Sequence, residues 1–144
     1  MVKFKRTQNL IPMQIQSYLS FSGQCQEAFN FYQSIFGGEI INRQTYEGKR
    51  IDIPDHFRNK LQHAELKGDG FHIMGYDATP DTPITQGTNI QMSIDLKDKE
   101  KAENIFKSLS KEGTTHTEFQ KTNWDAYYAR LTDIYGIQWM INAK

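Results

Sequence analysis

Residues 14–38 read QIQSYLSFSGQCQEAFNFYQSIFGG, and their hydrophobic period changes part-way along. Residues 14–21 alternate polar and apolar side chains, which predicts a strand with two different faces. From Cys25 to Phe36 the apolar side chains recur at helical spacing, and the glycine pair that follows favours the end of a helix. The segment therefore predicts a strand followed by an amphipathic helix.

The same order of elements returns later in the chain. Three predicted strands follow the first helix, at residues 39–46, 62–67 and 71–76. After a linker with two prolines, a second strand and a second helix begin at residues 89 and 98, and three more strands follow at 115–119, 125–131 and 137–142. The two predicted helices also share a short sequence pattern. Ala28 and the later FYQSI align with Ala102 and the later IFKSL at a constant offset.

These patterns predict an α+β fold of two tandem βαβββ modules, at residues 13–78 and 88–142, with the linker at 79–87. We expect the strands to form a curved mixed sheet around a cleft, with both helices on its outer face. Residues 1–12 are expected to be a flexible leader, so residues 13–144 make a single domain.

Composition narrows the class of protein. Among 144 residues, 17 lysines and arginines balance 17 aspartates and glutamates, which argues against nucleic acid as a partner because non-specific binding depends on a basic excess. No apolar run is long enough to span a bilayer and no signal peptide is evident, so a membrane is not expected as a partner. The single cysteine, Cys25, favours a reducing compartment, and we expect a cytoplasmic protein.

Strand alternation predicts which side chains face the helices. In the central hairpin, Ala64, Leu66 and Ile73 are expected to pack against a helix. Ile15 and Ile90 are expected to do the same in the strands that open each module. The opposite face then collects polar and aromatic side chains: Gln16, Tyr18, His63, Glu65, His72, Met74, Tyr76, Asn89, Gln91 and Met140. This face is either in contact with water or the lining of a cleft, and its shortage of charge favours the cleft.

Several motifs resemble a known superfamily. They are YLSFSG at residues 18–23, EAFNFYQSIFGG at 27–38, HAEL at 63–66, HIMGYD at 72–77 and TDIYGIQWMIN at 132–142. Over residues 13–142 the chain is similar to the vicinal oxygen chelate superfamily of glyoxalase I, bleomycin resistance proteins and extradiol dioxygenases, and more narrowly to its PhnB-like branch. The resemblance implies the two-module fold and a homodimer. It implies no single function, because that scaffold serves isomerases, dioxygenases, lyases and drug-binding proteins.

The resemblance also implies four metal-ligand positions, which fall on Gln16, Met74, Asn89 and Met140. Thioethers are poor ligands for Zn²⁺, Ni²⁺ or Mg²⁺, and amides are weak without an imidazole or a carboxylate. We therefore expect no metal at these positions and no cofactor for the protein. A divalent metal elsewhere on the polar face is the alternative.

A rebuilt site is expected in the central hairpin. If Gly68 and Asp69 form the turn, Glu65 lies directly across from His72, and His63 joins the same face. Two imidazoles and a carboxylate form a catalytic zinc set, or a metal-free acid–base pair in which the carboxylate orients the imidazole. A third interpretation is a cross-strand contact that only stabilises the hairpin.

These observations leave two functions open. The first is binding of a small-molecule ligand without metal, with Trp124 and Tyr128 as an apolar wall. The second is a lyase or isomerase that acts on a small oxygenated metabolite through His63, Glu65 and His72. The label demethylubiquinone methyltransferase, given to proteins of the PhnB-like branch, finds no support, because no strand leads into a glycine-rich loop for S-adenosylmethionine.

Overall fold

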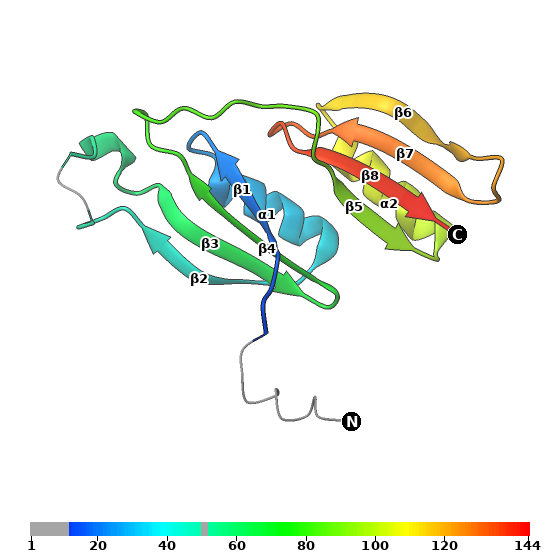
Figure 1. Cartoon of the computed structure of the whole chain (residues 1–144), viewed down its shortest axis with the longest axis horizontal. Coiled ribbons are helices and arrows are strands. Elements are labelled where there is room, and N and C mark those ends of the chain that lie inside the picture. Colours follow the sequence, from blue (N-terminus) through cyan, green and yellow to red (C-terminus); the bar gives the residue numbers. More distant parts are fainter. Residues whose placement is uncertain (1–11, 50–51) are drawn as a thin grey trace.

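The computed structural model describes residues 12–49 and 52–144, so the expected leader lies outside the described residues except for Pro12. The order of elements is βαβββ twice, which confirms the α+β class and the two modules (Figure 1). The first module holds β1 (Ser17–Phe21), α1 (Cys25–Phe36), β2 (Glu39–Thr45), the short 3₁₀ helix η2 (Asp55–Phe57), β3 (Leu61–Gly68) and β4 (Phe71–Asp77). The second holds β5 (Met92–Leu96), α2 (Lys99–Ser110), β6 (Thr114–Lys121), β7 (Tyr127–Thr132) and β8 (Gln138–Ala143).

Hydrogen bonding divides the strands into two mixed sheets of four strands, in the orders β1-β4-β3-β2 and β5-β8-β7-β6. In each sheet the first strand of the module runs parallel to the last, and the other pairs are antiparallel. The edge strands β1 and β5 lie toward the middle of the molecule, where residues of both line the same pockets (Figure 1). The strands therefore form two neighbouring sheets rather than one continuous curved sheet.

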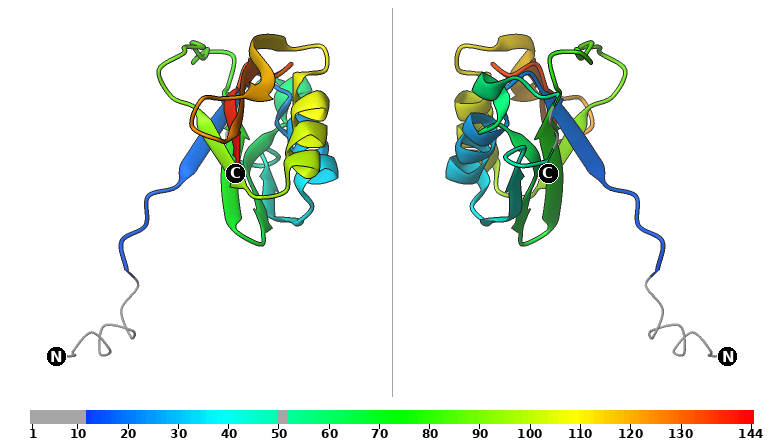
Figure 2. Two further views of the ribbon diagram at one scale, coloured as in Figure 1. Left: turned by 90° about the vertical axis from the view of Figure 1, so that its right-hand side faces the viewer. Right: turned by 90° about the vertical axis from the view of Figure 1, so that its left-hand side faces the viewer.

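Both helices cover the same side of the two sheets (Figure 2). Each helix contacts the strands of its own module. The buried side chains of both helices belong to one continuous core. They are Cys25, Ala28, Phe29, Tyr32, Ala102, Ile105, Phe106 and Leu109. Among the described residues, no helix is long and apolar enough to cross a membrane. The helices leave the opposite face of each sheet uncovered, and that face carries most of the polar side chains singled out in the sequence.

The start of α1 is held by a residue of β4. Asp77 is buried, and its two carboxylate oxygens accept hydrogen bonds of 2.8 Å from the backbone N–H groups of Cys25 and Leu61. Burial raises the pKa of this carboxyl group, and the hydrogen bonds that it accepts work in the opposite direction. Because the N-cap residue Gln24 makes no side-chain cap, Asp77 takes over that role and joins α1 to the beginning of β3.

A second buried carboxylate, Asp133, joins the two modules. It lies in the turn between β7 and β8, and its Oδ1 accepts from the backbone N–H groups of Tyr135 and Ile137 at 2.9 and 3.0 Å. Its Oδ2 accepts from the Tyr32 hydroxyl of α1 at 2.6 Å and from the Trp139 indole N–H at 2.8 Å. The turn of the second module is therefore tied to the helix of the first.

Two apolar residues do not pack as the alternation predicts. Ile15 and Ile90 are 89% and 78% exposed, because β1 and β5 begin only at Ser17 and Met92. The ladders to β4 and β8 start at those residues, so the alternation in the sequence continues past the last residue that has a partner strand. The prediction of strands from residues 14 and 89 is therefore wrong at those ends.

We expect the change Asp133→Asn to lower the free energy of unfolding by about 1–3 kcal/mol, because the amide turns a donor toward the buried donors of Tyr32 and Trp139. Urea denaturation of the full chain measures the difference. Asp95→Asn, at an exposed position of β5, is the matched control and should change stability by less than about 0.5 kcal/mol. An Asp133→Asn chain as stable as the unchanged protein would contradict the role given to this carboxylate.

Candidate functional site

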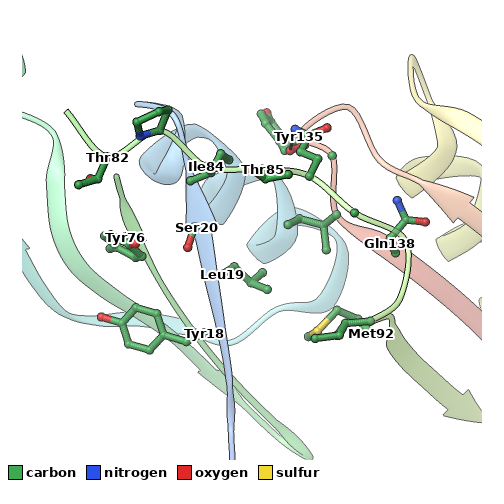
Figure 3. Close-up of a pocket in the computed structure, with 16 residues that line it drawn as sticks. Tyr18, Leu19, Ser20, Tyr76, Thr82, Ile84, Thr85, Met92, Tyr135 and Gln138 are labelled. Carbon is green, nitrogen blue, oxygen red and sulfur yellow. Dashed lines mark hydrogen bonds between the residues drawn. The ribbon is translucent and has the colours of Figure 1, made fainter. Parts of the chain in front are cut away.

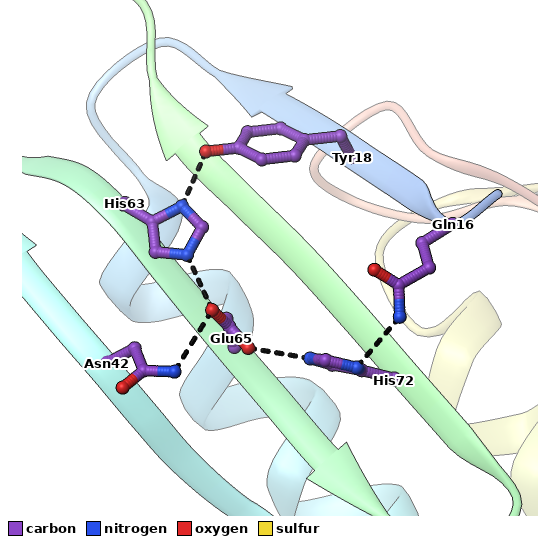
Figure 4. Close-up of polar contacts among 6 residues, drawn as sticks. All are labelled: Gln16, Tyr18, Asn42, His63, Glu65 and His72. Carbon is purple, nitrogen blue, oxygen red and sulfur yellow. Dashed lines mark hydrogen bonds and ion pairs between the residues drawn. The ribbon is translucent and has the colours of Figure 1, made fainter. Parts of the chain in front are cut away.

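The polar face of the first sheet is organised around the carboxylate of Glu65 in β3 (Figure 4). Its Oε2 lies 2.8 Å from Nε2 of His63 and 3.1 Å from the amide nitrogen of Asn42, and its Oε1 lies 2.7 Å from Nε2 of His72. The Glu65 side chain is 13% exposed, whereas the two imidazoles are 23% and 26% exposed. The carboxylate is therefore the more buried centre, and the imidazoles flank it.

Two further side chains extend the hydrogen bonds from β1 and the residue before it. The Tyr18 hydroxyl lies 2.6 Å from Nδ1 of His63, and the Gln16 amide nitrogen lies 2.9 Å from Nδ1 of His72. We call the whole set the Glu65 network: Gln16, Tyr18, Asn42, His63, Glu65 and His72. The structure thus brings the three predicted catalytic residues together on one face, with Glu65 in contact with His72.

The direction of each hydrogen bond follows from the charge on Glu65. The hydrogen bond from His63 lowers the pKa of Glu65 to about 2; burial opposes this shift, and two weaker hydrogen bonds add to it. Because the ionised carboxylate only accepts, Nε2 of each imidazole donates to it, and Nδ1 of a neutral ring is an acceptor. With both rings neutral, the Tyr18 hydroxyl and the Gln16 amide donate to those Nδ1 atoms, and every contact pairs one donor with one acceptor.

The register of the β3–β4 hairpin differs from the prediction. The turn begins one residue later, at Asp69, so Glu65 pairs with Met74 instead of His72. Gly70 supplies the positive φ of 86° that a two-residue turn favours. The predicted pairing is therefore wrong by two residues. A shift of two keeps every side chain on its face and leaves Glu65 and His72 in diagonal contact.

Asn42 does not stand out in the sequence. It lies in β2, where the ladder to β3 pairs Ile41 with Glu65 and then Gln44 with His63, so one extra residue forms a bulge. Asn42 has a positive φ of 51°, a conformation that asparagine adopts more readily than most residues. The bulge turns its amide toward Glu65. The only signal in the sequence is an asparagine inside a predicted strand.

Two other predicted ligand-binding residues, Met74 and Tyr76, lie next to the Glu65 network. Met74 lies on the same face, because it pairs with Glu65 across the hairpin. Tyr76 follows two residues later in β4, and its ring centroid lies 5.7 Å from that of Tyr18. The network therefore has an aromatic pair at the side of β1.

The second sheet has a positively charged side chain at the position where the first sheet has a negatively charged one. Arg130 pairs with Met140 across β7–β8 as Glu65 pairs with its methionine across β3–β4. The Arg130 Nε donates to Oε1 of Gln91 at 3.3 Å, and Tyr128 lies two residues away on the same face. The predicted residues Gln91, Tyr128 and Met140 therefore group around Arg130, and they take no part in the Glu65 network.

Asn89 and Trp124 lie outside the strands. Asn89 is exposed in the segment before β5, and Trp124 is 58% exposed in the loop between β6 and β7. Trp124 and Tyr128 do not lie on one strand, because β7 begins only at Tyr127 and Asp125 turns the chain with a φ of 62°.

The four positions that the superfamily resemblance offers for a metal do not fit one. Gln16 already donates to His72, Asn89 is exposed, and the other two positions are the thioethers of Met74 and Met140. Both ring nitrogens of both imidazoles are used within the Glu65 network. Among residues 12–49 and 52–144, no group of three or more His, Cys, Asp or Glu side chains is arranged to hold a metal ion.

Two neighbouring βαβββ modules with both helices on one side define a glyoxalase-like fold. A glyoxalase/bleomycin resistance protein/dioxygenase from Nocardioides shares it, with a TM-score of 0.53 at 13% identity over 97% of this chain and 89% of that chain. At this identity the likeness shows the fold alone.

More specifically, the chain belongs to the family described as 3-demethylubiquinone-9 3-methyltransferase, which matches residues 13–142. Protein PA1353 from Pseudomonas aeruginosa is 30% identical, with a TM-score of 0.83 over 92% of this chain and 98% of that chain. A PhnB protein from Bacillus cereus is 22% identical, with a TM-score of 0.80 over 92% and 100%. Protein YjdN of Escherichia coli (strain K12) is 26% identical over 140 residues, 90% of this chain and 95% of its own. The PhnB-like resemblance is confirmed.

Glu65 gives the stability of the fold a dependence on pH. Its pKa is about 2 in the folded chain against an ordinary value of 4.5, so its charge stabilises the fold above pH 4.5, and this contribution is lost as the pH falls toward 2. The difference corresponds to roughly 3 kcal/mol. We expect Glu65→Gln to remove up to that amount of stability at neutral pH and to flatten the loss of stability on acidification.

Urea denaturation of both chains at a series of pH values between 4.5 and 2 tests this expectation. Glu118→Gln, at an exposed position of β6, is the matched control and should keep the slope of the unchanged protein. If Glu65→Gln also keeps that slope, Glu65 does not hold its charge in the way described.

Proposed function

We propose that the protein binds a small molecule on the polar face of the first sheet, at the Glu65 network. The observation that carries this proposal is the closed set of hydrogen bonds around a partly buried carboxylate, on a face that no helix covers. Side chains held in place by one another lose little freedom when a ligand arrives, so the surface is organised for binding in advance. The core on the other face does not need these residues.

The direction of the hydrogen bonds supports a particular ligand chemistry. Tyr18, Gln16 and Asn42 turn donors inward, and their oxygens remain as acceptors (Figure 4). Glu65 adds a negative charge, and the aromatic pair of Tyr18 and Tyr76 lies beside it. A ligand that carries a cationic N–H group on an apolar body matches these features.

Benzylamine and its neutral counterpart benzyl alcohol are suitable probes for this site. In NMR titrations of the full chain, we expect shifts at Tyr18, His63 and Tyr76. Benzylamine should bind about tenfold more tightly than benzyl alcohol, because only the amine is attracted by the carboxylate. Glu65→Gln should remove the difference between the probes, whereas Glu118→Gln should keep it. Equal affinity of the unchanged protein for both probes, or shifts confined to other regions, would contradict the proposal.

A second candidate, a lyase or isomerase that acts on a small oxygenated metabolite, is favoured by one chain of contacts. Glu65 orients His63, and Nδ1 of His63 accepts a hydrogen bond from the Tyr18 hydroxyl. Partial burial raises the pKa of Tyr18, so the phenol keeps its proton and is suited to act as a general acid. Exchange of a carbon-bound proton of dihydroxyacetone with solvent deuterium, lost in Tyr18→Phe, would favour this candidate.

The methyl transfer named in the family's description is not part of this proposal. A site for S-adenosylmethionine needs a glycine-rich loop between a strand and a helix. In the described part of the chain, the loop between β1 and α1 holds one glycine, Gly23, and the loop between β5 and α2 holds none. A cytoplasmic setting is part of the proposal, because the single cysteine, Cys25, is free and buried.

We further propose that two copies pair through the segment before β1. Residues 12–15 project from the body of the molecule (Figure 2), and within them Met13 and Ile15 are 87% and 89% exposed. Apolar side chains held away from their own core are stabilised by packing on another surface. A second copy offers such a surface symmetrically, with the segment of each copy lying on the other.

Light scattering at micromolar concentration should therefore give twice the chain mass of 16.8 kDa, about 34 kDa. Ile15→Lys should shift the protein toward the monomer, because the charge would have to be buried in the interface. Gln120→Lys, at an exposed position of β6, is the control and should leave the mass unchanged. A monomer for the unchanged protein would overturn the pairing.

A further inference from the structure

Arg130 of β7 is half-buried, and no carboxylate of the described residues forms an ion pair with it. Arg58, the other half-buried arginine of residues 12–49 and 52–144, has Oδ1 of Asp55 at 3.2 Å from its Nε. Asp95 lies on the same sheet face as Arg130, but it is exposed and pairs with Asn142 farther along the sheet. A charge that loses part of its hydration without gaining a partner of opposite charge raises the free energy of the folded chain. An anion from outside the chain would therefore stabilise Arg130.

The strand neighbours of Arg130 on the open face are all uncharged. Thr117 of β6 and Met140 of β8 pair with it across the strands. Tyr128 and Thr132 lie two residues away along β7, so they share its face. None of these four side chains neutralises the guanidinium, and none repels an anion.

Gln91 orients the guanidinium and leaves its end free. The Arg130 Nε donates to Oε1 of Gln91 at 3.3 Å. Nothing in the described part of the chain accepts a hydrogen bond from Nη1 or Nη2, so the N–H groups of both atoms remain available. A pair of parallel N–H groups on a guanidinium matches the two oxygens of a carboxylate. The free end of Arg130 is therefore suited to a planar anion.

Tyr128 adds a hydroxyl donor and an aromatic ring to the same face. Its hydroxyl makes no hydrogen bond with a described residue, whereas the Tyr18 hydroxyl of the first sheet is bonded to His63. Aromatic rings bury a large apolar area for little loss of side-chain freedom. An anion that carries an aromatic or apolar body matches this neighbour of Arg130.

A pocket of about 470 Å³ between the two modules adjoins this part of the second sheet (Figure 3). Its lining includes Met92, which follows Gln91 in the chain, and Gln138, which pairs with Thr132 across β7 and β8. Arg130 is not among the lining residues. The guanidinium therefore lies outside the pocket, on the open face of the sheet, where a ligand reaches it from solvent.

We propose that Arg130, oriented by Gln91, binds the carboxylate of a small organic acid through its Nη1 and Nη2 N–H groups. The ring of Tyr128 lies beside the body of the acid. A carboxylate carries a single negative charge, which matches one arginine better than the nearly double charge of a phosphate monoester does. This site is separate from the Glu65 network and takes a ligand of opposite charge.

Benzoate and benzamide test this proposal with the full chain, because they have nearly the same shape and only benzoate is charged. In NMR titrations, benzoate should shift the Tyr128 ring and the Met140 methyl group and bind about tenfold more tightly than benzamide. Arg130→Gln should bring benzoate down to the affinity of benzamide. Arg43→Gln, which removes the same charge at an exposed position of β2, is the matched control and should leave both affinities unchanged.

Gln91→Glu tests the same site without removing the arginine. The new carboxylate lies against Nε of Arg130 and neutralises the guanidinium in place of a ligand. Benzoate should therefore bind about tenfold more weakly, to the level of benzamide. Urea denaturation should show no loss of stability, which separates this effect from damage to the fold.

Three results would count against the proposal. Equal affinity of the unchanged protein for benzoate and benzamide, or benzoate binding that survives both Arg130→Gln and Gln91→Glu, would overturn the site. Phenyl phosphate should bind no more tightly than benzoate, and tighter binding would overturn the assignment to a carboxylate. Benzylamine, the probe for the Glu65 network, should not displace benzoate, and displacement would overturn the separation of the two sites.

Discussion

Four donors converge on the buried carboxylate of Asp133, and the relative position of the two modules depends on that convergence. The Tyr32 hydroxyl comes from α1, whereas the other three donors belong to the β7–β8 turn and the strand after it. A buried carboxylate is costly unless its partners are in place, so the loss of any one of these donors leaves part of that cost unmet. It holds α1 against the β7–β8 turn of the second module.

The two modules have kept one backbone plan and reversed one charge. Glu65 and Arg130 lie at corresponding positions, each opposite a methionine of the last strand in its module. Glu65 is surrounded by two imidazoles and two amides, whereas Arg130 has one described amide partner, Gln91. The same sheet geometry can therefore present either sign of charge, and the side chains around each centre decide how firmly it is held.

Much of the fold could be predicted from the sequence, because hydrophobic period, turn residues and a repeated order of elements are local signals. The common face of His63, Glu65 and His72 follows from alternation, which survives a register error of two residues. Other features have no local signal. The contact of Tyr32 with Asp133 joins residues far apart in the chain. The bulge at Asn42 shifts the β2–β3 register by one residue, and nothing in the local sequence specifies that shift. A pocket between the modules depends on how the two folded modules pack together, which no local sequence pattern specifies.

The bulge at Asn42 also limits how this site can change during evolution. Its backbone lies in the left-handed region, where a β-branched or bulky side chain is strained, and its amide bonds to Glu65. Tyr18 and Gln16 have no positive φ, so the backbone places no such restriction on the side chains at those two positions. At position 42 the positive φ favours asparagine, aspartate and glycine over most other residues. The residue at position 42 is therefore restricted by the backbone conformation before any ligand restricts it.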